Sequence, residues 1–208
     1  MNFGLDILVY LVVLLFSLSI HESAHAWMAE RFGDPTGRRL GRVTLNPLPH
    51  LELVGSLVVP LVGLLAGGVI FGWAKPVPVN GANLRDPRRA NIFISAAGPV
   101  SNLIAAAGFL LGLRILGALS GDAALEGIVA PLELLCRAGL YLNVILAVFN
   151  LLPIPPLDGS WILESLLPGA FSKLFAAVRP YGFLLLIMLL YTGWLGKIIS
   201  PVMRTIQN

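Results

Sequence analysis

The sequence predicts an all-α polytopic membrane protein, a bundle of about five to six transmembrane or re-entrant segments with one short extended or β element. Of its 208 residues, 57% are hydrophobic and only 12% are charged, whereas a soluble domain carries about 25% charged residues. So few charged side chains cannot supply a surface that faces water. The third observation is a series of five apolar runs, most of them near the roughly 20 residues that cross a bilayer.

The first apolar run, residues 4–29, has neither Pro nor Gly after Gly4. It lacks the basic start and small-residue exit of a signal peptide, so we expect it in the mature protein. The other runs cover 51–71, 91–119, 128–152 and 181–199.

We expect residues 1–208 to form a single domain, because no internal repeat or low-complexity tail is visible. The single Cys136 excludes an intrachain disulfide. The net charge of +3 is too small and too dispersed to indicate a nucleic-acid partner.

Basic residues orient the chain, because they collect at the cytoplasmic ends of membrane spans. Four follow the first run and four follow the second: Arg31, Arg38, Arg39 and Arg42, then Lys75, Arg85, Arg88 and Arg89. A full crossing by 51–71 would put these two loops on opposite sides. Gly55, Pro60 and Gly63 weaken a straight helix there, so we expect 51–71 to re-enter on the cytoplasmic side.

Two shorter pieces connect the runs. Residues 71–79 are β-prone but interrupted by proline, which is typical of an edge strand or an extended loop. Residues 159–168 begin with Gly and end with Leu-Pro-Gly, so we expect a helix of about two turns near the inner surface.

The first run contains the motif H-E-x-x-H at His21, Glu22 and His25. Residues four apart lie on one face of a helix, so both imidazoles can bind one metal ion while Glu22 serves as general base. The alternative is that both histidines only hydrogen-bond neighbouring helices, with Glu22 protonated or paired to an arginine. Ionisable residues inside a membrane segment are costly to bury, which favours the metal site.

A catalytic zinc takes three protein ligands and keeps a fourth position open. Asp158 is the best candidate for the third ligand, because the three prolines before it end the fourth run and require an extended chain. The alternative role of Asp158 is the N-cap of the short helix that follows. His50 is the other possible ligand, although its place between Pro49 and Leu51 favours a surface role.

These residues resemble the site-2 proteases, the zinc metalloproteases of peptidase family M50 that cut peptide bonds inside membranes. The resemblance rests on three motifs in the family's order. They are H-E-x-x-H at 21–25, G-P-x-x-N at 98–102 and N-x-x-P-x-P-x-x-D-G at 150–159.

The resemblance implies one Zn²⁺ per chain, bound by His21, His25 and Asp158, with Glu22 as the catalytic acid and base. It implies that Asn102 and Asn150 hold the substrate or the oxyanion. Each asparagine has the alternative of a hydrogen bond to a neighbouring helix. It also implies a catalytic three-helix core, made of segments 4–29, 91–119 and 128–159.

The orientation of the runs agrees with this site. With 51–71 re-entrant, the first and fourth runs both point inward, so His21 and Asp158 reach a similar depth near the cytoplasmic side of the cell membrane. The family resemblance implies that the substrate is a transmembrane protein cut in regulated intramembrane proteolysis. The helix at 181–199 is a candidate gate for it. The alternatives are a non-catalytic relative that binds membrane helices and a metal transporter. The sequence leaves the oligomeric state open.

Overall fold

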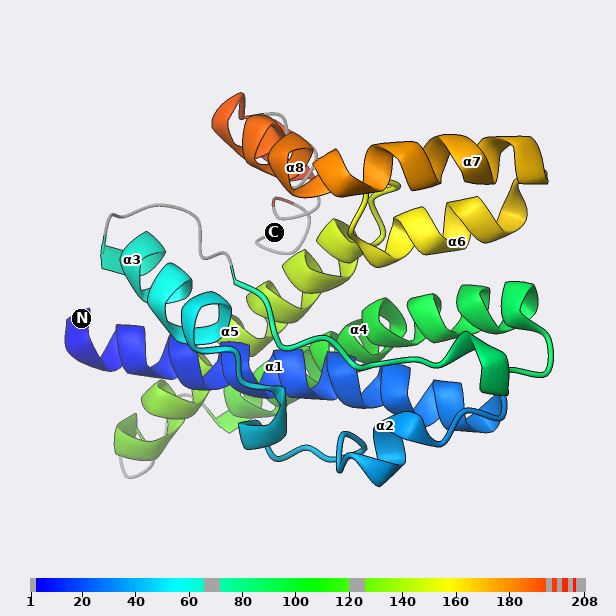
Figure 1. The fold of residues 1–208 in the computed structure, drawn as a ribbon. Helices are drawn as coiled ribbons and strands as arrows, with labels where there is room; N and C mark the ends of the chain where they lie inside the picture. The colour runs from blue at the N-terminus through cyan, green and yellow to red at the C-terminus, as the bar shows by residue number, and fades with distance from the viewer. Residues whose placement is uncertain are drawn as a thin grey trace.

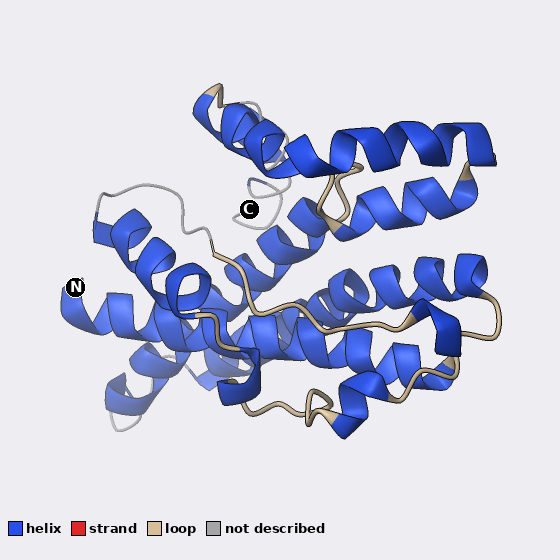
Figure 2. Ribbon diagram, in the orientation of Figure 1, coloured by secondary structure: helices blue, strands red, loops and turns tan. Residues whose placement is uncertain are grey.

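The computed structural model describes residues 3–65, 72–119, 126–193, 196–197, 200–201 and 204. Within these ranges every regular element is a helix and no β-strand occurs, as Figure 2 shows. Three of the described helices are long and apolar enough to cross a membrane: α1 (Phe3–Arg31), α4 (Pro87–Leu119) and α5 (Glu126–Asn150). The predicted all-α, multi-pass membrane protein is confirmed.

Helix α4 begins at Pro87, four residues earlier than the apolar run that predicted it. Proline is favoured in the first turn of a helix, where its missing N–H has no helical partner. The carboxylate of Asp86 accepts a hydrogen bond of 3.1 Å from the backbone N–H of Arg89 and so caps this end. Hydrophobicity alone did not detect this first turn, because it carries two arginines.

Helix α1 packs against both α4 and α5, which also pack against each other (Figure 1). The main core cluster joins α1 and α5: Val13, Leu14, Leu18, Ala138, Leu142 and Leu146, with Ala74 beside them. Where α4 meets α5, a Cβ on Gly139 would lie 2.6 Å from the ring of Phe109. Small residues of this kind let membrane helices approach closely. Close packing stabilises the bundle, because apolar lipid provides little hydrophobic drive for helix association.

Two of the expected membrane segments contain shorter helices. In 51–71, a π-helical stretch (Leu53–Val58) leads into α3 (Val59–Leu65), and residues 66–71 lie outside the described residues. The segment 181–199 contains α8 (Gly182–Tyr191), and residues 194–195 and 198–199 lie outside the described residues. Helix α7 (Gly169–Val178) precedes this segment. Re-entry by the first segment and gating by the second stay predictions.

Residues 72–80 form an extended segment, here called the strap, which runs past α1 in Figure 1. The backbone N–H groups of Trp73 and Lys75 donate to the carbonyls of Gly55 and His50, at 3.0 and 2.8 Å. Arg42, which is buried, donates to the carbonyls of Lys75 and Pro76 at 3.0 and 2.8 Å. Of the two predictions for this region, the extended loop holds for the described residues, and no edge strand forms.

Asp34 anchors the far end of the strap. Its fully buried carboxylate accepts hydrogen bonds from the Asn80 N–H at 2.7 Å and from the Asn83 side chain at 2.8 Å. Thr36, in the short helix α2 (Thr36–Arg39), donates its hydroxyl at 2.5 Å. Burial of the Asp34 carboxyl opposes its ionisation, but the hydrogen bonds outweigh burial and hold its pKa below the usual value.

The predicted short helix is α6 (Asp158–Leu166). Arg88, in the first turn of α4, donates to the carbonyls of Ser165 and Leu167 at 2.6 and 3.0 Å. These carbonyls have no helical partner at the end of α6, so Arg88 caps that end. The contact holds α6, which begins at Asp158, against α4.

Candidate metal centre

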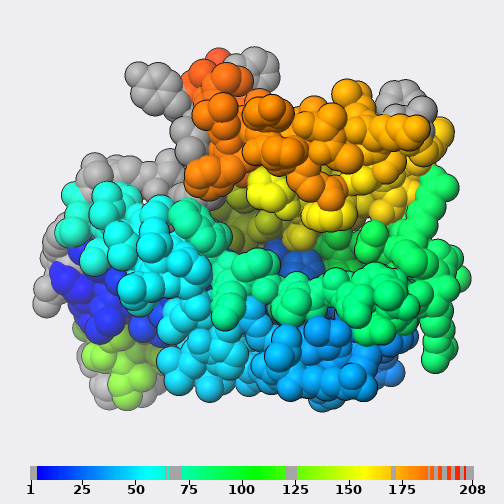
Figure 3. Space-filling view, viewed as in Figure 1, coloured from blue at the N-terminus to red at the C-terminus, as the bar shows by residue number. Residues whose placement is uncertain are grey.

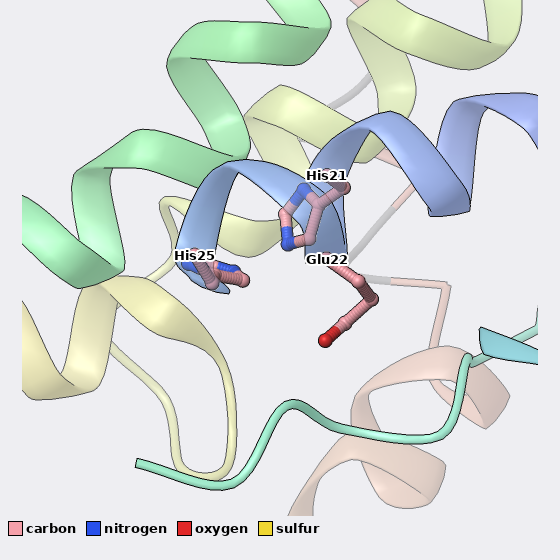
Figure 4. Close-up of side chains that lie close together, drawn as sticks. All are labelled: His21, Glu22 and His25. Atoms are coloured by element: carbon pink, nitrogen blue, oxygen red, sulfur yellow. The ribbon is translucent and has the colours of Figure 1, made fainter. Parts of the chain in front are cut away.

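Helix α1 brings His21, Glu22 and His25 to one place beside the strap. One ligand atom from each side chain lies within 4.8 Å of the other two. Figure 4 shows both imidazoles and the Glu22 carboxylate projecting from consecutive turns of α1, with Glu22 directed toward the strap. Both histidines are buried, with exposed fractions of 5% and 8%, and they share one face of α1, as their four-residue spacing predicts.

The Nδ1 atom of each ring is used by α4. His21 Nδ1 lies 2.6 Å from Oδ1 of Asn102, and His25 Nδ1 lies 2.6 Å from the carbonyl oxygen of Ile94. Since both partners are oxygen acceptors, each Nδ1 is placed to donate, which leaves each Nε2 as the nitrogen available to a metal ion.

Both Nε2 atoms lie beside the same oxygen of Asp158. Oδ2 of Asp158 is 3.1 Å from Nε2 of His21 and 3.4 Å from Nε2 of His25. Asp158 is the first residue of α6 and makes no capping hydrogen bond there, because Leu157 occupies the N-cap position. The structure thus brings the distant Asp158 to the H-E-x-x-H motif.

The donor set suits a zinc ion. Asp158 Oδ2 is buried and has no hydrogen-bond partner among the described residues, so three electron-rich atoms converge on one point. Zinc takes tetrahedral N and O ligands at about 2.0–2.2 Å, which separates two ligands by about 3.3–3.5 Å. The two separations to Asp158, 3.1 and 3.4 Å, are close to that value.

Gly98 of α4 lies against the Nε2 edge of the two imidazoles. A Cβ at this position would be 2.5 Å from Nε2 of His25 and 2.6 Å from Nε2 of His21. Contacts this short are not tolerated by rigid rings whose Nδ1 atoms are held by α4. The glycine therefore lets α4 approach α1 closely enough for Asn102 and Ile94 to hold the rings.

Glu22 is held by the strap. Its Oε2 accepts a hydrogen bond of 3.0 Å from the backbone N–H of Val77, and Glu22 lines the cavity beside the histidines. No sequence pattern indicated Val77, because a backbone donor leaves no trace in residue type.

The two asparagines of the family motifs lie in different places. Asn102 is fully buried behind His21 and donates from Nδ2 to the carbonyl of Ser17 and to Oδ1 of Asn143. This geometry supports the helix–helix alternative for Asn102. Asn150 lines the cavity and donates to the carbonyl of Leu146 at 2.9 Å.

Asn143 is a second residue of the site that the sequence motifs do not include. It is fully buried in α5 and bonded to α1 and α4. An asparagine in the middle of an apolar span was the signal that could have revealed it.

The expected surface role of His50 is wrong. The side chain is only 2% exposed, and its Nε2 lies 3.1 Å from the carbonyl of Thr44. Burial lowers the pKa of the imidazole below its usual value, and the charge of Arg42 adds to this effect. His50 does not belong to the metal-ligand cluster, and its carbonyl supports the strap instead.

A cavity of about 1090 Å³ opens beside the cluster. His21, Glu22, His25 and Asp158 line it, together with many apolar residues of α1, α5, α8 and the strap. Figure 3 shows the molecule hollowed between α6 and the strap, with atoms of α1 at the bottom. Pockets for small molecules measure about 300–1,000 Å³, so this cavity has room for a segment of polypeptide.

Known proteins resemble this chain over most of its length. The profile of peptidase family M50 matches residues 115–191, which include Asp158. YwhC of Bacillus subtilis, named as a candidate zinc metalloprotease, is 39% identical over 97% of this chain and 89% of its own length. Rip2 of Mycolicibacterium smegmatis, named in the same way, is 34% identical over 88% of this chain and 66% of Rip2. Rip2 of Mycobacterium tuberculosis (strain H37Rv) is 32% identical over 86% of this chain and 67% of Rip2. No solved structure matches the chain.

A bundle of membrane helices with an H-E-x-x-H cluster, and relatives with these names, define a membrane protein of the metalloprotease class. The chain belongs to peptidase family M50, the site-2 protease family.

Proposed function

We propose that this protein is an intramembrane zinc metalloprotease, which hydrolyses a peptide bond in or near the transmembrane segment of a membrane protein substrate. The observation that carries the proposal is the convergence of His21, His25 and Asp158 at the wall of a cavity that Glu22 also lines. Two histidines and one carboxylate are the ligands of a catalytic zinc that keeps an open position.

His21, His25 and Asp158 would bind one Zn²⁺ per chain. When bound, the metal supplies Lewis-acid chemistry that lowers the pKa of water and polarises the scissile carbonyl. Glu22 takes the proton of the attacking water and delivers it to the leaving amine. Asn150, whose side chain lines the cavity, is the candidate donor to the substrate or the oxyanion.

The whole of residues 1–208 acts as one domain in this proposal, with catalytic segments 4–29, 91–119 and 128–159. The site faces the cytoplasmic side of the cell membrane, because the loops after α1 and before α4 carry the clustered arginines. The substrate is a transmembrane protein cut in regulated intramembrane proteolysis. The apolar lining of the cavity and its volume support a substrate of this kind.

The test is cleavage of a panel of single-span membrane proteins by the protein in detergent. Wild type, Glu22→Gln and a chelator-treated sample with zinc restored are compared. Two results together support the protease. Wild type cleaves a substrate, loses cleavage on chelation and regains it with zinc, and the cleavage rate of Glu22→Gln is at least about 100-fold lower. Glu133→Gln is the control, because Glu133 pairs with the exposed Arg137 at 3.6 Å, away from the cluster.

Metal content separates the alternatives. Wild type without bound zinc and without cleavage would favour a helix-binding relative. A metal transporter would move zinc across vesicles and would tolerate Glu22→Gln, whereas a protease would not.

A further inference from the structure

Behind His21, side chains from three membrane helices form a continuous hydrogen-bonded chain. His21 Nδ1 lies 2.6 Å from Oδ1 of Asn102, whose Nδ2 donates to Oδ1 of Asn143 at 2.8 Å. Nδ2 of Asn143 then donates to Oγ of Ser17 at 2.8 Å. Asn102, Asn143 and Ser17 are at most 1% exposed. Burying polar side chains inside a membrane bundle costs free energy, so a complete hydrogen-bonded chain of them indicates a functional role.

Two backbone carbonyls give this chain its direction. The carbonyl of Ser17 lies 3.1 Å from Nδ2 of Asn102, and the carbonyl of Gly139 lies 2.8 Å from Nδ2 of Asn143. A carbonyl can only accept, so each must face an amide NH₂ and not an amide oxygen. The oxygen of Asn143 is thereby turned to Asn102, and the oxygen of Asn102 is turned to His21.

We infer that Asn143 is a positioning residue. Through Asn102 it fixes the proton of His21 on Nδ1 and so keeps Nε2 as the metal-binding nitrogen. The inference rests on the proposed function where it concerns the metal. A ring nitrogen that faces an amide oxygen must donate, which leaves the lone pair on the nitrogen beside Asp158.

Only His21 needs a side chain to fix the orientation of its hydrogen-bond partner. His25 Nδ1 faces the carbonyl of Ile94 directly, and a backbone carbonyl cannot turn around. His21 faces a side-chain amide, which can rotate to present its NH₂ and would then favour the wrong tautomer. Asn143 and the carbonyl of Ser17 together prevent this, because a rotated Asn102 would set its oxygen against the oxygens of both.

The chain contains only three histidines, so labelling them selectively with ¹⁵N resolves every imidazole by NMR. For the zinc-loaded protein in detergent micelles, we expect the N–H on Nδ1 of His21 and His25. For His50 we expect it on Nε2, which faces the carbonyl of Thr44, so His50 is an internal reference. A proton on Nε2 of His21, with the metal on Nδ1, would overturn the inference without any substitution.

The second measurement uses Asn143→Leu, with Asn143→Ala as the variant to use if leucine does not fold. We expect the His21 N–H to exchange faster with water, while the His25 and His50 signals stay as in wild type. The dissociation constant for zinc, measured by competition with a chelator, should rise about 10-fold, the lower end for groups that orient metal ligands.

Glu133→Gln is the control, because Glu133 is also a polar residue of α5 but pairs with the exposed Arg137 at 3.6 Å. Its zinc affinity and His21 signal should equal those of wild type. A folded Asn143 variant with the zinc affinity and the His21 signal of wild type would overturn the positioning role alone. Wild type that binds no zinc would instead overturn the proposed function together with this inference.

Discussion

The backbone N–H of Val77 donates a hydrogen bond of 3.0 Å to Oε2 of Glu22. One carboxylate oxygen is thereby tied to the strap, and the other is left for the water that Glu22 would deprotonate. The strap is itself held in its middle, by Arg42 on the carbonyls of Lys75 and Pro76, and at its far end, by Asp34 on the N–H of Asn80. A loop without regular structure therefore positions the general base of the proposed reaction.

Removing the Val77 N–H should slow cleavage without loss of zinc. An ester in place of this amide, introduced as the α-hydroxy analogue of valine at 77, deletes the donor and keeps the side chain. A hydrogen bond to a charged group contributes about 1.5–3 kcal/mol, so we expect kcat to fall roughly 10- to 100-fold. The same ester at Val79 is the control, because no hydrogen bond of the Val79 N–H is found among the described residues. Equal rates for the two esters would contradict the role of Val77.

Gly98→Ala should abolish tight zinc binding in a folded protein. The new methyl group would lie 2.5–2.6 Å from Nε2 of His25 and His21, so the rings must leave the positions that face Asp158. We expect the zinc affinity, measured by chelator competition, to fall at least about 10-fold. Gly108→Ala, on the same helix with nothing within 4 Å of the new Cβ, should bind zinc like wild type. Zinc binding by Gly98→Ala at wild-type strength would show that the rings lie elsewhere.

Asp34 should make stability depend on pH at the acid end. Its folded pKa is held below the usual value of 3.8, so the ionised carboxylate stabilises the fold fully above about pH 4. That contribution is lost as the pH falls through the folded pKa. The thermal midpoint of wild type should therefore exceed that of Asp34→Asn above pH 4, and the difference should shrink toward lower pH. If the difference in thermal midpoint does not change with pH, the charge of Asp34 does not contribute to stability, and this prediction is wrong.

Asn150→Ala should lower the cleavage rate, whereas Asn102→Leu should weaken zinc binding. Asn150 lines the cavity, and Asn102 is buried behind His21. We expect Asn150→Ala to lower kcat/KM by about 10²-fold, the loss typical of one oxyanion donor, with zinc affinity unchanged. Asn102→Leu should weaken zinc binding about 10- to 100-fold. The same loss of zinc in both variants would reject the substrate role of Asn150.

Local patterns accounted for much of the fold and for the ligand cluster. The apolar runs at 4–29, 91–119 and 128–152 predicted α1, α4 and α5, because the length and hydropathy of a membrane helix are written in consecutive residues. The spacing of His21 and His25 predicted their common face for the same reason. Asp158 was predicted from the prolines before it and from a family motif, since no local rule connects it to His25, 133 residues earlier.

The sequence by itself determined the membrane class, the three long helices and the residue types of the candidate centre, because these depend on composition and helical period. Only the tertiary structure decided that His50 is buried, that Val77 holds Glu22, and that Asn143 stands behind Asn102. Each of these contacts joins elements that are far apart in the chain. They depend on backbone donors and on the close approach of helices at Gly98 and Gly139, which packing fixes and residue order does not reveal.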